Sequence, residues 1–181
     1  MNNRLNKFLF YQYKRDFLLK KNIKNIMQIP ELTSITLSSS LALGNQEEKL
    51  LSPVLLGLEK ISHQKPKKTY AKKSLAEFQL KKGQLLGCKV TLRSFLMYEF
   101  LESLILLVFP QIPDFSYKKQ TSFSSSKDIS FGFSQISFFP EIERDFEILE
   151  LMKGLNITIS TSGKAKQDSI LLLTSFKFPI K

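Results

Sequence analysis

Side chains that can hold phosphate gather between residues 65 and 93 of this chain. This stretch contains a single acid, Glu77, and nine cations, which are Lys65, Lys67, Lys68, Lys72, Lys73, Lys81, Lys82, Lys89 and Arg93. Each lysine or arginine that neutralises a phosphate releases condensed counterions, which favours binding to a nucleic acid. An ordinary solvated surface is the alternative, and the one-sided charge makes it the less favoured interpretation.

Residues 87–93 (GCKVTLR) alternate between apolar and polar types, which predicts a strand. Alternation places one set on the apolar side, namely Cys88, Val90 and Leu92, and the other on the polar side, namely Lys89, Thr91 and Arg93. Two cations and a hydroxyl on an open sheet face can lie along an RNA backbone and its 2′-hydroxyl groups. Spacing alone favours this interpretation and a plain solvated strand face equally.

Few residues offer catalytic or metal chemistry. His63 and Cys88 are the one histidine and the one cysteine, whereas a structural zinc site needs about four ligands. No partner in a recognisable catalytic motif accompanies His63, so we expect a surface histidine. Glu141, Glu143 and Asp145 resemble a metal cluster, but acids are also favoured at a helix N-terminus. We therefore predict no enzymatic activity, no cofactor and no metal site.

The length of 181 residues and the 43% hydrophobic content suit one domain with a real core. Lysine and arginine number 27 and aspartate and glutamate 16, so the formal net charge is +11. This excess points to an anionic partner, either a nucleic acid or an anionic membrane. The longest apolar stretch, residues 103–113, is shorter than the roughly 18 to 20 residues of a membrane-spanning helix, and we interpret it as the end of a buried helix.

Hydrophobic spacing predicts helices over residues 5–21, 50–62, 95–109, 141–153 and 169–176. The first of these is basic enough to pass for a transit peptide, although Asp16 and the lack of serine favour a mature helix. Strands are predicted over residues 34–38, 87–93, 129–138 and 155–161, with Phe131, Phe133 and Phe138 more suited to the core than to base stacking.

Ser38, Ser39 and Ser40 are expected to form a turn, and residues 113–128 a long exposed polar loop. The irregular mixture of elements, without a Gly-rich phosphate loop, predicts an α+β fold. We expect one compact domain over residues 1–181, with an antiparallel sheet, helices packed on one face and a long protruding loop.

Several strings resemble, in order, the L-five family of large-subunit ribosomal proteins, which bind 5S rRNA. The most distinctive string is KISHQKPKKTYAKKSLAEFQLKKGQLLGCKVTLRS. It is preceded by NIMQIPELTSITL and followed by MYEFLESLI, FPQIPDF, FFPEIE, GLNITISTS and LLLTSFKFPIK. The resemblance runs from about residue 8 to the end, with order and spacing preserved.

The resemblance implies a structural protein of the ribosomal central protuberance, with an antiparallel sheet flanked by helices. Its implied partners are 5S rRNA, large-subunit rRNA, peptidyl-site tRNA, a small-subunit head protein reached through an intersubunit bridge, and neighbouring large-subunit proteins. The family pattern places 5S rRNA on Gln64, Thr91 and Arg93, to which the basic stretch adds Lys65, Lys67 and Lys89.

The family's tRNA-contacting loop matches residues 71–83, where the contacts would come from Lys72, Lys73, Ser74, Phe78, Lys81 and Lys82. Composition independently favours a mobile, protruding loop, because the four lysines repel one another around an apolar centre. The alternative is a short hairpin packed on the sheet by Leu75 and Phe78.

Three stretches depart from the family's usual pattern. Three serines, 38–40, replace an Asn-Met-Gly type of turn, Glu77 replaces a glycine of the loop, and SFSSSKDISFGFS replaces a Gly-rich region. GCKVTLR and MYEFLESL look more like bacterial and mitochondrial members than plastid ones, and the Phe, Lys, Ile and Ser bias suggests a skewed organelle genome. Because the match begins almost at the first residue, we expect a mitochondrially encoded ribosomal protein, with a plastid as runner-up. An RNA chaperone or membrane-surface protein outside the ribosome is the alternative function.

Overall fold

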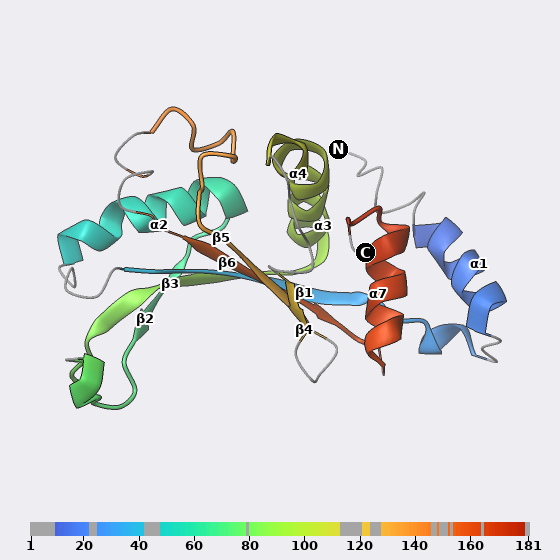
Figure 1. Cartoon of the computed structure of the whole chain (residues 1–181), viewed down its shortest axis with the longest axis horizontal. Coiled ribbons are helices and arrows are strands. Elements are labelled where there is room, and N and C mark those ends of the chain that lie inside the picture. The colour runs from blue at the N-terminus through green and yellow to red at the C-terminus, as the bar shows by residue number, and fades with distance from the viewer. Residues whose placement is uncertain are drawn as a thin grey trace. The chain divides into compact units, whose positions relative to one another are not determined.

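The computed structural model describes residues 10–21, 25–41, 48–78, 80–112, 121–123, 128–145, 148, 152, 154–163 and 165–179. Its packing separates two compact units. Unit 1 comprises residues 1–35, 93–131 and 158–181, and unit 2 comprises residues 36–92 and 132–157. Six strands form one sheet in the order β2 (Lys67–Tyr70), β3 (Leu85–Leu92), β1 (Leu32–Ser40), β6 (Leu155–Thr161), β5 (Ile129–Phe133) and β4 (Thr121–Phe123). All six are labelled in Figure 1.

Unit 2 is built on the packing of helix α2 (Glu48–Ser62) against β3. Leu51, Val54 and Leu58 are fully buried, and their spacing of three and four residues puts them on one helix face. The thiol of Cys88 on β3 lies 4.0 Å from the carbonyl oxygen of Val54. Burial of apolar side chains in this layer removes their surface from water, which is the main stabilising contribution to the fold.

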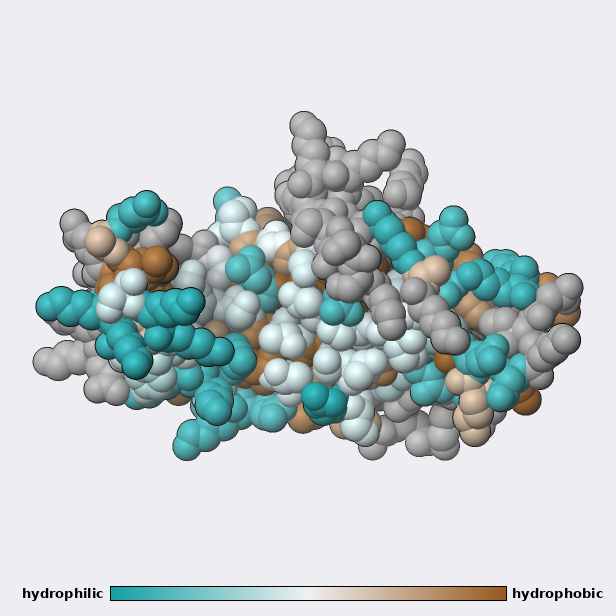
Figure 2. Space-filling view, turned by 90° about the horizontal axis from the view of Figure 1, so that it is seen from below, coloured by the Kyte–Doolittle hydropathy of each residue, from teal (hydrophilic) through white to brown (hydrophobic). Residues whose placement is uncertain are grey.

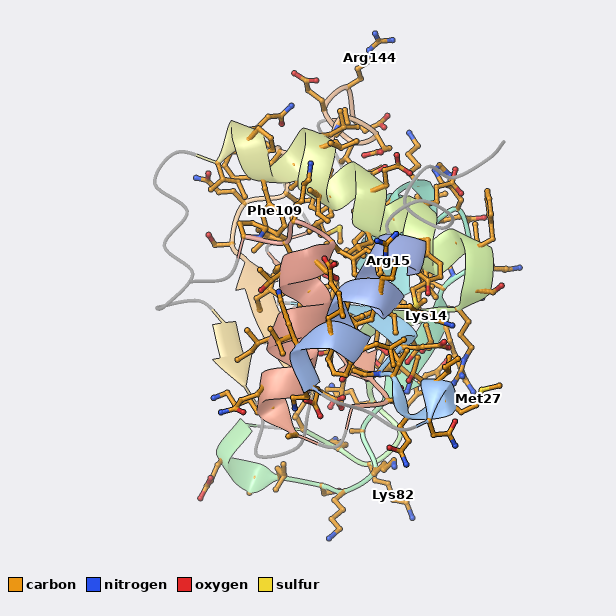
Figure 3. The ribbon with its side chains drawn as sticks, turned by 90° about the vertical axis from the view of Figure 1, so that its right-hand side faces the viewer. Lys14, Arg15, Met27, Lys82, Phe109 and Arg144 are labelled. Atoms are coloured by element: carbon orange, nitrogen blue, oxygen red, sulfur yellow. The ribbon has the colours of Figure 1, made fainter. Side chains whose placement is uncertain are left out.

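Unit 1 holds helix α1 (Phe10–Lys21) beside helix α7 (Lys166–Ser175), as Figures 1 and 3 both show. The rings of Tyr13 and Phe17 on α1 lie 5.4 Å apart, and the ring of Tyr13 lies 6.3 Å from that of Phe176. Lys21 on α1 forms an ion pair with Asp168 on α7. The two helices are therefore joined by both aromatic packing and a charge pair.

A continuous helical segment, residues 94–111, also contributes to the unit 1 core. It consists of α3 (Ser94–Ser103), the π-helical turn η4 (Leu104–Val108) and α4 (Phe109–Gln111). Phe109 packs edge-on against Phe178, with ring centroids 5.0 Å apart. The segment is long and apolar enough to cross a membrane, but a core helix of a soluble protein passes the same test. One side of it, including Met97, Leu101 and Leu104, is buried in unit 1.

The α+β fold class with an antiparallel sheet is confirmed. Helices lie close to four of the predicted positions, and the last strand matches its predicted bounds, 155–161. In β3 the predicted alternation is confirmed, because Cys88, Val90 and Leu92 are buried and Lys89 is exposed. Residues 5–9 of the first predicted helix lie outside the described residues.

The predicted turn at residues 38–40 is wrong, because β1 continues through Ser40. The buried hydroxyl of Ser39 donates a hydrogen bond of 2.8 Å to the carbonyl oxygen of Gly154, and Leu41 N donates to the carbonyl of Leu86. Serine tolerates an extended backbone, so these bonds continue the strand where composition alone suggested a turn.

The region after β5 also differs from prediction. β5 ends at Phe133, and residues 140–144 form turns where a helix was expected from 141. Hydrogen bonds from Phe139 N to the carbonyl of Ile136 and from Ile142 N to that of Phe139 span three residues each. The side chains of Ile136, Phe139 and Ile142 are all buried, so these successive turns bury every third residue. An α-helix has about 3.6 residues per turn and would bury its residues at a longer spacing. The bond from Met152 N to the carbonyl of Ile148 is helical, and residues 146, 147, 149–151 and 153 lie outside the described part.

Two short strands were not predicted. Strand β2 lies in what was interpreted only as a basic stretch, and β4 lies within residues 113–128, interpreted as a polar loop. β4 pairs antiparallel with β5, with Thr121 opposite Phe131. The rest of that expected loop, residues 113–120 and 124–127, lies outside the described residues.

Candidate nucleic-acid interface

Two lysines predicted to bind RNA are brought face to face in unit 2. The antiparallel pairing of β2 with β3 sets Lys67 directly opposite Lys89, and both side chains are exposed. Directly opposed residues in such a pair have Cβ atoms about 4.5–5.5 Å apart and point to the same face, and like charges there are destabilising. In the isolated protein the two ammonium groups therefore repel each other. A bound anion such as phosphate would relieve that repulsion.

A row of hydroxyl groups extends this face of unit 2. In β1 the buried residues Ile35, Leu37 and Ser39 alternate with the less buried Thr36, Ser38 and Ser40. Thr91 of β3 is likewise half-buried between two buried neighbours, two positions beyond Lys89. Because side chains alternate along strands, the less buried set lies on the face opposite the apolar core. Because hydroxyl side chains are small, the backbone of a bound partner can come close to the sheet. Hydroxyl groups can also both donate and accept hydrogen bonds.

The turn between α2 and β2 presents Gln64 and Lys65, which are both exposed. His63 adopts a left-handed backbone conformation (φ 51°), which reverses the chain at the end of α2. The buried hydroxyl of Ser62 lies within hydrogen-bond distance of the carbonyl oxygens of Leu58 (2.6 Å) and Gln64 (2.9 Å) and accepts a hydrogen bond from Gln64 N (3.3 Å), so it holds the turn from inside. Gln64 and Lys65 lie on this short connection, and Lys67 is the first residue of β2. His63 is an exposed residue, as expected.

Arg93 follows β3 directly and is exposed. It belongs to unit 1, where it precedes the first turn of α3 with an extended backbone (φ −140°, ψ 163°). Its guanidinium has five donors suited to bidentate contacts with phosphate. The proximity of Arg93 to Gln64 stays a prediction.

Residues 71–78 and 80–83 extend the β2–β3 hairpin. Its base is closed by hydrogen bonds from Ala71 N to the carbonyl of Gln84 (2.8 Å) and from Gly83 N to the carbonyl of Ala71 (2.9 Å). Leu75 and Leu80 exchange two backbone hydrogen bonds of 3.0 Å, and Lys82 N donates to the hydroxyl of Ser74. Gly83 has φ +85°, a conformation that favours glycine. A regular hairpin frame therefore presents this segment.

The end of that hairpin is exposed. Its exposed residues include the predicted tRNA-contacting residues Lys72, Lys73, Ser74, Lys81 and Lys82. Leu75 is 49% exposed, so it does not pack the hairpin onto the sheet, and the side chain of Phe78 lies outside the described residues. Figure 3 shows Lys82 pointing away from the ribbon, and Figure 2 shows the hairpin, at the left, as mostly hydrophilic side chains around a small apolar group.

Tyr70 and Thr36 were not among the residues predicted to bind RNA, and Ser38 and Ser40 were predicted only as part of a turn. Tyr70 is 54% exposed and lies at an irregularity in the β2–β3 register, where Tyr70 pairs with Leu85. Bulges of this kind often redirect a side chain beside a functional site, and an exposed aromatic ring can stack on a base. The aromatic residue amid lysines in KTYAKK and the alternation in SITLSSS were the signals that could have identified them.

The groups considered for catalysis or metal binding lie elsewhere. Burial raises the pKa of the Cys88 thiol to about 12, so this thiol stays protonated at neutral pH. Among the residues that the structure describes, no three His, Cys, Asp or Glu side chains gather as a possible metal site. Asp145 instead forms an ion pair with Lys60 of α2. Phe131 and Phe133 are buried in the core, whereas Phe138 is half-buried.

Two models of known protein families match the segments that contain this basic hairpin and the sheet. A model described as ribosomal protein L5 matches residues 25–81, and one described as the ribosomal L5P family C-terminus matches residues 85–180. The chain belongs to the ribosomal protein L5 family. Together the two matches include both strands of the hairpin and the Lys67–Lys89 pair.

Relatives in the L5 family match nearly the whole chain. A large ribosomal subunit protein uL5 of Nitrosomonas europaea is 38% identical over 175 residues, which cover 94% of this chain and 97% of the relative. Proteins of the same name from Buchnera aphidicola subsp. Schizaphis graminum and Psychrobacter sp. are each 37% identical, covering 95% and 94% of this chain and 98% and 94% of the relatives. These three relatives are bacterial proteins, so they do not bear out the expected mitochondrial origin.

Proposed function

We propose that this chain is a structural constituent of a large ribosomal subunit and that it binds 5S rRNA through the face that carries Lys67, Lys89 and Thr91. Membership of the L5 family supports this function. The observation that carries the proposed site is the direct opposition of Lys67 and Lys89 across the β2–β3 pair. A phosphate between two such cations would turn a repulsive pair into two charge-assisted contacts.

The proposed interface extends from the lysine pair in two directions. The turn residues Gln64 and Lys65 flank the start of β2, and Thr91 and Arg93 follow Lys89 along the chain. Hydroxyl, amide and guanidinium groups suit RNA because they contact both phosphates and 2′-hydroxyls. We assign no catalytic role to the chain, in keeping with the names of its relatives.

The hairpin end, residues 72–82, is proposed to contact peptidyl-site tRNA. Its support is the exposure of four lysines on a hydrogen-bonded frame. A hydrogen-bonded frame that presents cationic and apolar side chains at its end suits a contact with tRNA. A bridge to the small-subunit head, and contacts with large-subunit rRNA and neighbouring large-subunit proteins, complete the proposed partners.

A mitochondrial ribosome remains the proposed location, supported only by the Phe, Lys, Ile and Ser bias of the sequence. Immunodetection of the chain in separated mitochondrial, plastid and cytosolic ribosomes of its source cell tests that location. Exclusive recovery from either of the latter two fractions would contradict it.

Sedimentation tests the proposed function directly. The full chain should migrate with intact large subunits at high magnesium and remain with a released 5S rRNA particle when the subunit is stripped at low magnesium. A chain that sediments free of ribosomes at every magnesium concentration would contradict the proposal and favour an RNA chaperone or membrane-surface protein.

A further inference from the structure

The outward face of the helical segment 94–111 differs in chemistry from the rest of this cationic chain. Residues 94–112 contain two glutamates and neither lysine nor arginine, in a chain with 27 such cations. Phe95 is 42% exposed, Leu106 63% and Leu107 46%, so large apolar side chains are left in water. A face of this kind is unsuited to phosphate, and exposed apolar groups rimmed by polar ones mark contact sites.

Helical spacing places these side chains in one stripe. Phe95, Glu99, Glu102 and Leu106 are separated by four, three and four residues, which puts them on the same face. The two glutamates are half-buried, and neither forms an ion pair within the described part of the chain. The stripe therefore has two carboxylates in its middle, which can accept hydrogen bonds, and one apolar side chain at each end.

The π-helical turn sets the apolar end of this stripe. Phe109 N donates to the carbonyl of Leu104, five residues earlier, so this turn is one residue wider than an α-helical turn. Leu104, Val108 and Phe109 remain buried on either side of it. Leu106 and Leu107 both face outward, although Leu104 and Val108 in the same turn belong to the core. π-turns of this kind occur frequently at functional sites.

We propose that this face, the acidic stripe, docks a segment of another protein that carries apolar side chains flanked by lysine or arginine. Charge complementarity selects this occupant, because only a cationic partner satisfies Glu99 and Glu102 while Leu106 and Leu107 are covered. Spacing of four, three and four residues also suits an amphipathic partner helix. The acidic stripe is separate in sequence and in charge from the lysine pair of β2 and β3.

The same observations argue against other occupants. RNA phosphates would be repelled by both glutamates. Membrane-surface helices carry lysine and arginine on their polar side, whereas this segment has none. A second copy of the chain would oppose its own stripe with like charges in a two-fold contact.

Site-specific photocrosslinking tests the proposal in cells that express the full chain. p-Benzoylphenylalanine replaces Leu106, and in a matched control it replaces Leu56, which is 51% exposed on α2 of unit 2. After irradiation the tagged chain is purified under denaturing conditions, and the crosslinked residue is mapped by mass spectrometry. We expect position 106 to crosslink to a protein segment that contains both apolar residues and lysine or arginine within a few positions, and position 56 not to reach that segment.

Charge reversal completes the test. Glu99→Lys combined with Glu102→Lys should lower the crosslink yield at position 106 about tenfold, because like charges then face each other, while Glu99→Gln with Glu102→Gln should lower it less. Crosslinks to RNA, lipid or a second copy, no yield above the Leu56 control, or a yield unaffected by charge reversal would overturn the proposal. Sedimentation of the same variants reports ribosome association separately, so failure of the docking face and failure of the ribosomal function are distinguishable.

Discussion

Gly87 of β3 lies so close to Ser39 of β1 that no side chain fits between the two strands. A Cβ atom on residue 87 would come within 2.3 Å of the backbone oxygen of Ser39 and 2.8 Å of the Cα of Ser40. Backbone atoms cannot move aside as a flexible side chain would. Gly87 therefore sets the close approach of β1 and β3, the two strands that carry the hydroxyl row and Lys89.

Replacement of Gly87 by alanine should destabilise the protein. The added methyl group must push β1 from β3, and overpacking of this kind costs about 1–3 kcal/mol. Urea denaturation of the purified chain measures the change in the free energy of unfolding. Gly154→Ala is the control, because its Cβ would lie 3.4 Å from its nearest neighbour, the carbonyl oxygen of Phe133. Equal stability of Gly87→Ala and the unaltered chain would contradict the close approach.

Lys67→Glu should stabilise the free protein and weaken its binding to RNA. The substitution places an opposite charge against Lys89, and cross-strand pairs of opposite charge contribute about 0.2–1 kcal/mol. Loss of one phosphate contact lowers RNA affinity at the same time. Thermal unfolding and RNA titration of the same sample measure both effects. Lys20→Glu, on the exposed side of α1, changes the net charge equally and should affect RNA binding less. A Lys67→Glu variant with unchanged RNA affinity would show that the lysine pair does not bind phosphate.

The buried thiol of Cys88 should make stability depend on alkaline pH. Burial raises its pKa from the ordinary 9.0 to about 12 in the folded protein. Below pH 9 the thiol is protonated in both the folded and the unfolded state, so the contribution of the buried thiol to the free energy of unfolding is fully present there. Between pH 9 and 12 the unfolded chain loses the proton and the folded chain does not, so stability falls as pH rises.

Comparison with Cys88→Ala isolates this contribution from the titration of lysines. Between pH 8 and pH 10 the free energy of unfolding of the unaltered chain should fall by about 1 kcal/mol relative to that of the variant. The reason is that pH 10 lies about one unit above the ordinary pKa of the thiol, and each unit corresponds to roughly 1.4 kcal/mol. Parallel pH curves for the two proteins would contradict burial of the thiol. The folded chain should also react slowly with a disulfide reagent at pH 8, and rapidly in urea.

Deletion of residues 74–80 should leave the fold and 5S rRNA binding nearly intact while impairing translation. The deletion removes the Leu75–Leu80 bridge but spares the bonds between Ala71 and both Gly83 and Gln84 that close the hairpin base. Circular dichroism, an RNA titration and a translation assay measure the three properties. Unfolding of the shortened chain would assign the segment to the core and contradict its role as a contact for tRNA.

Sequence periodicity predicted the elements whose side chains repeat regularly. Leu51, Val54 and Leu58 fall on one helical face, and Cys88, Val90 and Leu92 on one strand face, so burial followed directly from spacing. The serines 38–40 misled prediction because serine is common in turns, whereas the bond from Ser39 to Gly154 joins residues 115 positions apart in the sequence. Long-range partners of that kind leave no local signal.

The sequence indicated which basic residues would be exposed on unit 2, but not how they pair across the strands. The excess of lysine between residues 65 and 93 indicated a phosphate-binding surface, and Lys89 fell on the polar strand face as expected. The opposition of Lys67 to Lys89 required the register of β2 on β3, and β2 is only four residues long. A strand this short and basic resembles a loop in any hydrophobic pattern.

The dissociation constant for 5S rRNA from the source ribosome, measured against an excess of unrelated RNA, tests the central claim most directly. The account predicts binding that resists the competitor, with log K falling with log salt at a slope of about −4 to −5 if about six phosphates are contacted. Arg93→Ala should weaken binding by roughly 1 to 3 kcal/mol, and Arg144→Ala, on the turns after Pro140 (Figure 3), should have little effect. Equal affinity for 5S rRNA and the unrelated RNA, or affinity that does not change with salt, would contradict the account.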